Sequence, residues 1–332
     1  MSGRAVREFD LIQRFFDRPT SQRQVCLGIG DDGAILQVPE AHELVVVTDT
    51  LVEGVHFRAT DAPDDLGYKA LAVNLSDLAA MGAVPVWALL NLTLPEANES
   101  WLGKFSDGFF SLAAQYDVAL VGGDTTRGPL CVSVTAGGWV LAGQALTRSG
   151  AAVSDRVWIT GTIGDAALAL ALAEQSLANV GSETRWLLDR LHRPTPRIGI
   201  GQALYGLASA VIDISDGLLA DLGQIVGASG QAGAMIETTS LPLSPAGESY
   251  PLEDRMTAAL TGGDDYELCM TVPQAKSDRV RRLSEEAGVP LTDIGCITDQ
   301  AGITLTRAGV PIAGPSRPGY EHLWPVIGER GS

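Results

Sequence analysis

Positive charge is scarce in this 332-residue sequence. Lysine and arginine together number 23, against 40 aspartates and glutamates, and the formal net charge is −17 at pH 7. Lysine occurs only at Lys69, Lys104 and Lys276. Because nucleic acids are bound through clusters of lysine and arginine, this balance argues against a nucleic-acid partner. An acidic protein that handles a phosphorylated substrate needs cations such as Mg²⁺ to cancel the repulsion. The composition therefore predicts metal-dependent phosphate chemistry if phosphate is handled at all.

Long apolar runs are also missing. The longest, such as residues 166–173, fall well short of the roughly 20 residues that a membrane-spanning helix needs. The first residues include Arg4, Arg7 and Glu8 and contain no apolar signal-peptide core. The sequence therefore predicts a cytoplasmic protein with no membrane partner.

Cysteine and histidine are rare, and several familiar catalytic motifs are absent. The four cysteines form no C-x-x-C pair and lie mostly in apolar, strand-like runs, so buried reduced thiols are expected rather than zinc sites or disulfides; they are Cys26, Cys131, Cys269 and Cys296. The sequence contains only four histidines, so a histidine-rich metal site is not expected. The sequence contains no G-x-x-x-x-G-K-[ST], G-x-S-x-G or H-E-x-x-H, which argues against P-loop NTPases, α/β-hydrolases and zinc proteases.

The apolar pattern predicts an α/β (α+β) protein of two domains, 1–148 and 149–332, with their junction in the small and polar stretch 143–155 around Arg148. Expected strands in the first half are 24–29, 43–49, 86–94, 118–121 and 130–142, with helices at 64–81 and 98–116. Expected strands in the second half are 157–160, 210–214, 233–238, 266–272, 291–298 and 302–306, with helices at 184–192, 196–208, 253–260 and 274–287.

Two acidic stretches follow apolar runs in the first half. The run 24–29 is followed by the adjacent carboxylates Asp31 and Asp32 between glycines. Because successive strand side chains point to opposite faces, at most one of the two faces a given site, and Asp32 is the favoured metal ligand. The alternative is a solvated turn. The second stretch, residues 48–50, carries Asp49 and two threonine hydroxyls, which suit Mg²⁺, or is an ordinary exit from a strand.

Asp77 lies in the apolar segment 71–81, which is predicted to be helical. A carboxylate surrounded by so much apolar surface must be paired or metal-bound, since burying an unpaired charge costs several kcal/mol. A salt bridge is the less expected solution, because Lys69 is the only lysine nearby in the sequence. Asp77 is therefore a candidate metal ligand.

Three further stretches combine glycine with acids. In 122–128 the glycines let a phosphate approach backbone N–H groups, Asp124 can bind a metal and Arg127 can contact an anion. In 213–216, Asp213 and Ser215 are predicted to share a strand face, and Asp216 stands where a helix begins. The acidic turn 262–267 can hold a cationic substrate. Each stretch has a structural alternative as a turn or a helix start.

Seven segments, in order, closely resemble the thiamine-monophosphate kinases: GIGDDGAIL, TDTLVEGVHF, YKALAVNLSDLAAMGA, LVGGDTTRGPL, ALTRSGA, IDISDGLLADLG and GGDDYEL. These kinases belong to a superfamily that includes aminoimidazole ribonucleotide synthetase and selenophosphate synthetase, and the similarity spans roughly residues 8–324. It implies the two-domain aminoimidazole ribonucleotide synthetase-like fold, with a mixed β-sheet N-terminal domain and an α/β C-terminal domain. It further implies transfer of the γ-phosphate of ATP to thiamine monophosphate with several Mg²⁺ ions, in a homodimer formed through the N-terminal domain.

The resemblance also implies roles for individual residues. The Mg²⁺ ligands would be Asp32, Thr48, Asp49, Asp77, Asp124, Asp213 and Asp216, with the main chain of Val47 as a further ligand. The ATP contacts would be Gly123, Asp124, Arg148 and Ser215. The thiamine contacts would be His56, Asp264 and Tyr320. No protein nucleophile or base is required, because the acceptor phosphate has a second pKa of about 6 and is largely deprotonated at pH 7.

One motif departs from the family. The chain has Asp264 in Gly-Gly-Asp-Asp where the family usually has Gly-Gly-Glu-Asp, and aspartate is one methylene shorter. The nearest alternative function is aminoimidazole ribonucleotide or selenophosphate synthesis by a sibling enzyme. A non-enzymatic module for divalent cations is a second alternative. It would explain the aspartates but not the 122–128 stretch, and no acidic stretch has EF-hand spacing.

Overall fold

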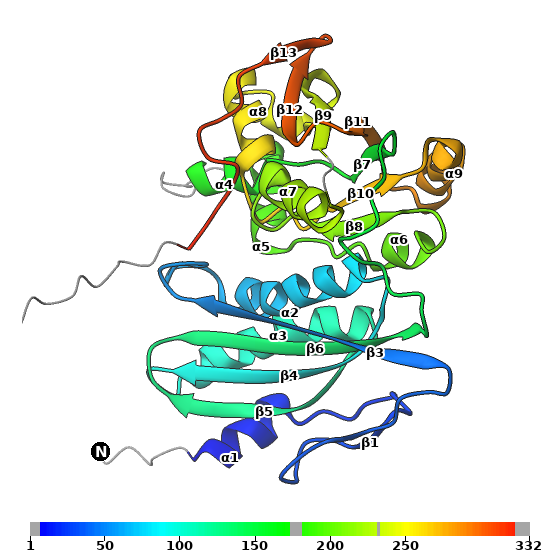
Figure 1. The fold of residues 1–332 in the computed structure, drawn as a ribbon. Coiled ribbons are helices and arrows are strands. Elements are labelled where there is room, and N and C mark those ends of the chain that lie inside the picture. Colours follow the sequence, from blue (N-terminus) through cyan, green and yellow to red (C-terminus); the bar gives the residue numbers. More distant parts are fainter. Residues whose placement is uncertain (1–6, 173–180, 231–232, 323–332) are drawn as a thin grey trace, which may run out of the picture.

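The computed structural model describes residues 7–172, 181–230 and 233–322. These residues form two regions stacked on each other, one around a four-stranded sheet and one around a seven-stranded sheet (Figure 1). Helices in the described ranges are all too short or too polar to cross a bilayer. The architecture is the predicted α+β arrangement, whereas the domain boundary at residue 148 stays a prediction.

The first region is built on a mixed sheet in the strand order β3-β6-β4-β5. The strands are β3 (His42–Val52), β4 (Val84–Leu94), β5 (Ala119–Arg127) and β6 (Cys131–Leu141), and only the β4/β5 pair is parallel. Helices α2 (Pro63–Ala80) and α3 (Glu99–Gln115) bury one face of this sheet. The opposite face exposes apolar side chains, among them Leu44 and Val46. Smaller elements are α1 (Glu8–Leu11), the π-helical turn η1 (Ile12–Phe16), β1 (Val25–Leu27) and β2 (Ile35–Leu36).

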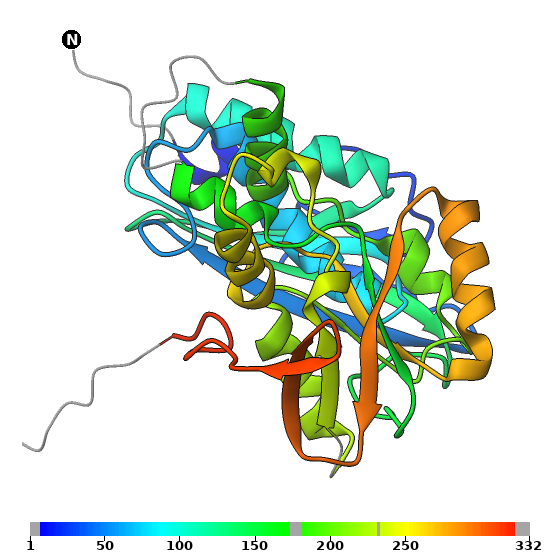
Figure 2. The same cartoon turned by 90° about the horizontal axis from the view of Figure 1, so that it is seen from above.

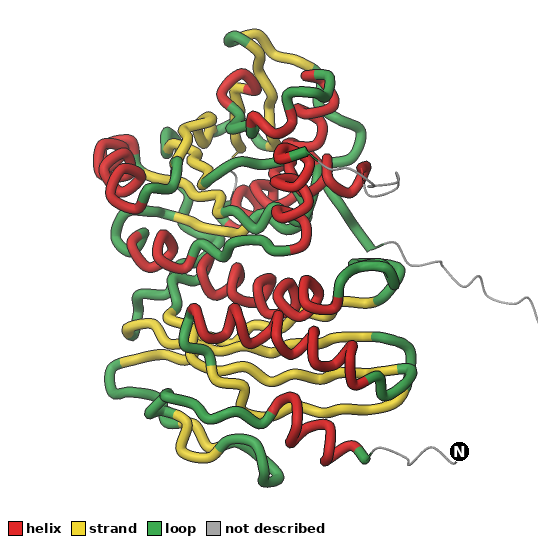
Figure 3. The backbone as a smooth tube through the Cα atoms, turned by 180° about the vertical axis from the view of Figure 1, so that it is seen from behind, coloured by secondary structure: helices red, strands yellow, loops and turns green. Residues whose placement is uncertain are grey.

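Helix α2 lies between the two regions (Figure 3). It begins with a proline at its first turn, ends before Gly82 at φ +69°, and buries most of its length. Its close crossing with α3 depends on glycine, because a Cβ at Gly67 would lie 2.0 Å from the carbonyl oxygen of Phe105 and one at Gly108 1.8 Å from that of Asp64. The helix is therefore held tightly on the side of the first region.

The second region is built on a sheet in the order β13-β12-β9-β11-β7-β10-β8. The strands are β7 (Arg156–Thr160), β8 (Ala210–Asp213), β9 (Gly233–Glu237), β10 (Leu268–Val272), β11 (Leu291–Thr298), β12 (Gly302–Arg307) and β13 (Val310–Ile312). The helices are α4 (Asp165–Leu172), α5 (Ser182–His192), α6 (Ile198–Ala203), α7 (Leu218–Ala228), α8 (Leu252–Thr261) and α9 (Ser277–Ala287), with 3-10 turns η2 (Thr238–Ser240), η3 (Pro245–Gly247) and η4 (Gln274–Lys276). Figure 2 shows α9 at one edge of the molecule, beside β11.

One hydrophobic core crosses the junction between the regions. Leu71 and Leu75 of α2 belong to the same buried cluster as Ile200 of α6 and Met270 of β10. Arg193, just after α5, adds ion pairs with both acids of the first turn of α2. Burial of apolar surface contributes about 25 cal/mol per Å², so this continuous core fixes the two regions relative to each other.

Three expectations about local structure were wrong. The stretch 122–128 is not a loop, because β5 runs on to Arg127; Gly123 is needed inside the strand, since a Cβ there would lie 1.8 Å from the oxygen of Leu90 in β4. Strand β1 ends at Leu27, so Asp31 and Asp32 lie beyond it. Strand β8 ends at Asp213, so Ser215 lies in a loop rather than on a shared strand face. All four cysteines are free, but only Cys269 is fully buried and Cys26 is exposed.

Candidate active site

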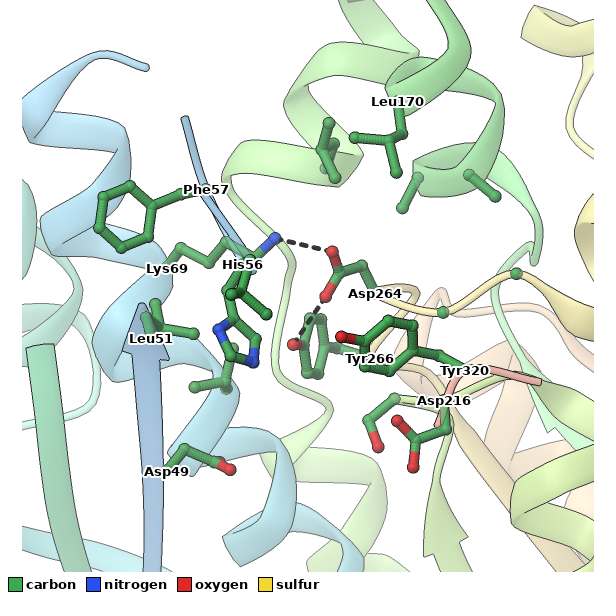
Figure 4. A pocket seen from close by; sticks show the side chains of 18 of the residues that line it. Asp49, Leu51, His56, Phe57, Lys69, Leu170, Asp216, Asp264, Tyr266 and Tyr320 are labelled. Carbon is green, nitrogen blue, oxygen red and sulfur yellow. Dashed lines mark hydrogen bonds and ion pairs between the residues drawn. The ribbon is translucent and has the colours of Figure 1, made fainter. Parts of the chain in front are cut away.

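A cavity of about 820 Å³ lies where β3 and α2 of the first region face β8 and the loops of the second. It brings together predicted site residues that are up to 271 positions apart in the chain. Those that line it are Asp49, His56, Asp77, Asp213, Ser215, Asp216, Asp264 and Tyr320. Figure 4 shows several of their side chains pointing into one space.

Three carboxylates form one end of this cavity. Asp49 lies inside β3 rather than at its end, Asp77 lies on α2, and Asp213 is the last residue of β8. Burial, and then the charges of Asp213 and Asp49, raise the pKa of Asp77 to about 8. Burial also raises the pKa of Asp213 to about 6, although Ser76 Oγ on α2 donates a hydrogen bond of 2.7 Å to its Oδ2. The three carboxylates are thus partly or fully buried and close enough to raise one another's pKa.

Ser215 and Asp216 are held by a residue that sequence reasoning missed. Oδ2 of Asp221, in the first turn of α7, accepts the backbone N–H groups of Ser215, Asp216 and Gly217 at 3.0, 3.1 and 3.1 Å. Burial, followed by the charges of Asp213 and Asp216, raises the pKa of Asp221 to about 7. The only signal in the sequence was a second aspartate four residues after Gly217, inside an apolar helix.

Aromatic and charged side chains form the other end of the cavity. The His56 ring lies 5.4 Å from the His322 ring, which in turn lies 5.0 Å from the ring of Tyr320. His56 Nδ1 accepts the backbone N–H of Val52 at 3.0 Å, so in the neutral ring the proton is on Nε2. Burial, and then His322, lower the pKa of His56 and favour this neutral form. His322 and Lys69 also line the cavity, although no sequence motif indicates a site role for either.

A second pocket, of about 800 Å³, holds half of the remaining predicted residues. Asp32, Gly123 and Asp124 line it beside β5, at the opposite edge of the four-stranded sheet from β3. Asp32 and Asp124 are exposed. The single chain therefore does not bring these two aspartates together with Asp49, Asp77 and Asp213.

Val47, Thr48 and Arg148 line neither cavity. Thr48 Oγ1 donates a hydrogen bond of 3.1 Å to the oxygen of Val134 in β6 and lies on the exposed sheet face. Val47, its neighbour, faces the side of the helices and packs against the core. The charge of Arg148 opposes the rise in the pKa of both Asp77 and Asp213, which indicates that the guanidinium lies near the acidic end of the cavity.

The donor chemistry of the acidic end fits a hard divalent cation. Among the described residues no group of three or more His, Cys, Asp or Glu side chains is already gathered closely enough to enclose a metal ion. The three crowded carboxylates nevertheless offer only oxygen ligands, as Mg²⁺ prefers. A nearby cation would also offset the repulsion that raises the pKa of Asp77.

Comparison with known proteins places the chain in a family. Residues 30–140 match the model of the AIR synthase related protein N-terminal domain, and residues 152–307 match the model of the C-terminal domain. The thiamine-monophosphate kinase of Salmonella typhimurium is 50% identical over 324 residues, which is 96% of this chain and 99% of that protein. The chain belongs to the thiamine-monophosphate kinase family.

Solved structures of this family have the same fold. The thiamine-monophosphate kinase of Stenotrophomonas maltophilia has a TM-score of 0.82 and 49% identity, covering 86% of this chain and 92% of that one. A structure described as AaThiL complexed with AMPPCP and TMP has a TM-score of 0.76 and 32% identity, covering 89% and 92%. The predicted family and fold are thus confirmed.

Proposed function

We propose that the protein transfers the γ-phosphate of ATP to the phosphate of thiamine monophosphate, giving thiamine diphosphate. The main support is the cavity, which joins carboxylates suited to a phosphate-bound cation at one end with a ring-lined, partly acidic site at the other. The family, in which relatives are thiamine-monophosphate kinases and one structure holds AMPPCP and TMP, supports the same reaction. The sibling syntheses and the metal-binding module have no comparable support.

In this proposal the protein positions two anions and does not attack either of them. Asp49, Asp77 and Asp213 would hold Mg²⁺ at the acidic end, with Asp216 at its edge. When bound there, Mg²⁺ would neutralise phosphoryl charge and align acceptor and donor for in-line transfer. His56, Asp264 and Tyr320 would hold the thiamine moiety, and an aromatic face such as that of Tyr320 would attract its thiazolium cation.

We also propose that the protein is a homodimer in which a second copy completes the site. Asp124 on β5 is aligned through Asn91 and Ser133 with Thr50 on β3, which places the two edge strands about 14 Å apart, since neighbouring strands are about 4.8 Å apart. The exposed sheet face, which includes Leu44 and Val46, can pack against the same face of a second copy. Such packing can bring strand β5 of one copy close to strand β3 of the other. Asp32, Gly123 and Asp124 would then bind the ATP and metal ions held in the cavity of the partner subunit. Arg148 and Ser215 would bind ATP in the cavity of their own subunit.

The proposed reaction can be tested with the purified chain, ATP, thiamine monophosphate and Mg²⁺, by following thiamine diphosphate by chromatography. We expect product with thiamine monophosphate and none with aminoimidazole precursors or selenide. Chelation of divalent cations should stop the reaction. Asp299→Asn, at an exposed turn, is a matched control that should retain full activity. Absence of thiamine diphosphate under these conditions would refute the proposal.

A further inference from the structure

Lys69 is a buried cation that faces the cavity. It lies on α2, its side chain is 5% exposed, and its Nζ is 3.0 Å from Oδ2 of Asp264 in the second region. Tyr266 Oη donates a hydrogen bond of 2.9 Å to the other oxygen of the same carboxylate. Figure 4 shows these contacts beside His56 and Tyr320. Both partners of the ion pair line the cavity, so the pair is accessible to a ligand.

The backbone holds this carboxylate in an unusual conformation. Asp264 has φ +68° and Tyr266 has φ +50°, both in the left-handed region that non-glycine residues seldom occupy. Their N–H groups donate to the oxygens of Ser215 and Ile214 at 2.9 and 2.8 Å, which ties the loop to the end of β8. Such conformations are energetically costly and are concentrated at sites that need a fixed geometry.

The pair has unused hydrogen-bonding capacity. Among the described residues, Asp264 is the one hydrogen-bond partner of Lys69 Nζ, although an ammonium has three N–H donors. Each oxygen of Asp264 accepts a single hydrogen bond and can accept another. A buried ammonium with free donors is costly, so a ligand acceptor beside Lys69 and a ligand donor beside Asp264 would both be stabilising.

The position of the pair matches one end of the proposed substrate. Lys69 precedes Asp77 by eight residues on α2, which places them about 12 Å apart along the helix. This length is comparable with that of extended thiamine monophosphate from its pyrimidine to its phosphate. Phe57, Leu66 and Leu170 also line the cavity and provide apolar walls for a flat ring. When the phosphate of the substrate binds at the acidic end of the cavity, its pyrimidine ring reaches Lys69.

We propose that Lys69 and Asp264 together recognise the aminopyrimidine edge of the substrate. Asp264 accepts a hydrogen bond from the exocyclic amine, and Lys69 donates one to the adjacent ring nitrogen. The 3.0 Å spacing of the pair suits two neighbouring groups on one ring. This inference rests on the proposed function, and it makes Lys69 a determinant of specificity in addition to its role as the partner of Asp264.

The test uses thiamine monophosphate and its analogue in which an oxo group replaces the exocyclic amine. The oxo compound reverses the pattern, because it presents an acceptor to Asp264 and a ring N–H to Lys69. Binding of both compounds is measured calorimetrically without ATP, and kcat/KM for both is measured with ATP. Wild type should favour the amino compound roughly ten-fold or more, since each mismatched charged hydrogen bond costs at least that factor.

Lys69→Met should weaken binding of the amino compound roughly ten-fold or more and reduce the preference over the oxo compound, with the KM for ATP unchanged. Lys69→Arg should restore part of the preference. Arg193→Met is the control, because Arg193 also bridges α2 to the second region, through Asp64 and Asp65, but does not line the cavity. It should lower the melting temperature and leave the preference intact.

Two results would overturn the inference. One is a Lys69→Met variant that binds both compounds more weakly by the same factor. That result would mean that Lys69 contacts a group that both compounds share, such as the phosphate, or only joins the two regions. The other is a wild-type protein that binds both compounds equally. Because binding is measured without ATP, failure to form thiamine diphosphate would count against the proposed function alone.

Discussion

The cavity between the regions and the pocket beside β5 contain the same kind of side chain in opposite surroundings. In the cavity, Asp213 is 3% exposed and receives a hydrogen bond from another element. In the pocket, Asp32 and Asp124 are exposed. This difference supports the proposal that the exposed aspartates of the pocket act in the cavity of a second copy rather than at a site within their own chain. A carboxylate that is to bind a shared phosphate or metal can stay in water until a partner covers it, which avoids the cost of burying it alone.

The largest expected effect concerns the framework behind the cavity. Glu267 is fully buried and accepts hydrogen bonds from Arg190, Arg197 and Thr160. Glu267→Gln should lower the free energy of unfolding by about 3–5 kcal/mol, because it removes the counter-charge of the partly buried Arg197 and leaves the buried Arg190 with only the more distant Asp165, at 3.9 Å, as an ion-pair partner among the described residues. Urea denaturation measures this change. Asp278→Asn removes an exposed ion pair with Arg281 and should change it by less than about 1 kcal/mol. Equal changes would contradict the contrast between buried and exposed carboxylates.

The next largest effect concerns the acidic end. Asp77→Asn should reduce turnover by at least about a hundred-fold, as expected when a metal-binding carboxylate is lost. Burial raises the pKa of Asp77 to about 8, so above its unfolded-state pKa the folded protein must either keep this carboxyl protonated or bury its charge, and both cost free energy. In a chelator at pH 7 the variant should therefore melt at or above the wild-type temperature. A stable variant with normal turnover would remove Asp77 from the proposed site.

A mixing experiment tests whether the two sites meet across a dimer. Asp49→Asn and Asp124→Asn should each be inactive alone. If Asp124 acts in the partner's cavity, half of the randomly mixed dimers are mixed, and each of these has one intact site. Activity after subunit exchange should then reach about a quarter of the wild-type value. If both aspartates act in their own chain, mixing restores nothing, and light scattering should then be used to ask whether the protein is a dimer.

The smallest effect separates the two neighbouring aspartates of the exposed pocket. Asp31 Oδ1 accepts the backbone N–H of Asp32 at 2.8 Å, so Asp31 is engaged in shaping the turn. Asp32→Asn should lower kcat/KM about ten-fold or more as a lost ligand, and Asp31→Asn less than about three-fold. Steady-state kinetics over a range of Mg²⁺ concentrations would show the difference. A larger loss for Asp31→Asn would exchange their proposed roles.

Local pattern was enough to predict most of the elements, and residue chemistry pointed to several of the carboxylates that line the cavity. The helix expected at 64–81 is α2 (Pro63–Ala80), and that expected at 98–116 is α3 (Glu99–Gln115), because both have proline, asparagine or glycine at their ends. The sequence predicts that strand β5 ends at residue 121, because glycine is disfavoured inside strands, yet the strand continues to Arg127. Glycine is required there because the backbone of the neighbouring strand approaches closely. Such an approach is tertiary and leaves no local signal.

The partners of the predicted residues could not be found in the sequence for a similar reason. Lys69 was considered for Asp77, which is close in sequence, yet it pairs with Asp264, 195 residues away. In the sequence, Asp221 resembles any other acidic residue of a helix. Only the fold shows that its carboxylate accepts hydrogen bonds from the backbone of residues 215–217. The separation of Asp32 and Asp124 from the other carboxylates depends on strand order, which spacing along the chain does not reveal.

The packing of α2 between both regions has a consequence for attempts to redesign the protein. Its glycine crossing with α3 and its apolar contacts with α6 and β8 leave few positions on the helix that tolerate substitution without loss of folding. Directed evolution toward new acceptors should therefore find its useful variants in the segments 53–58 and 313–320, where a changed side chain alters the cavity entrance while the scaffold remains intact.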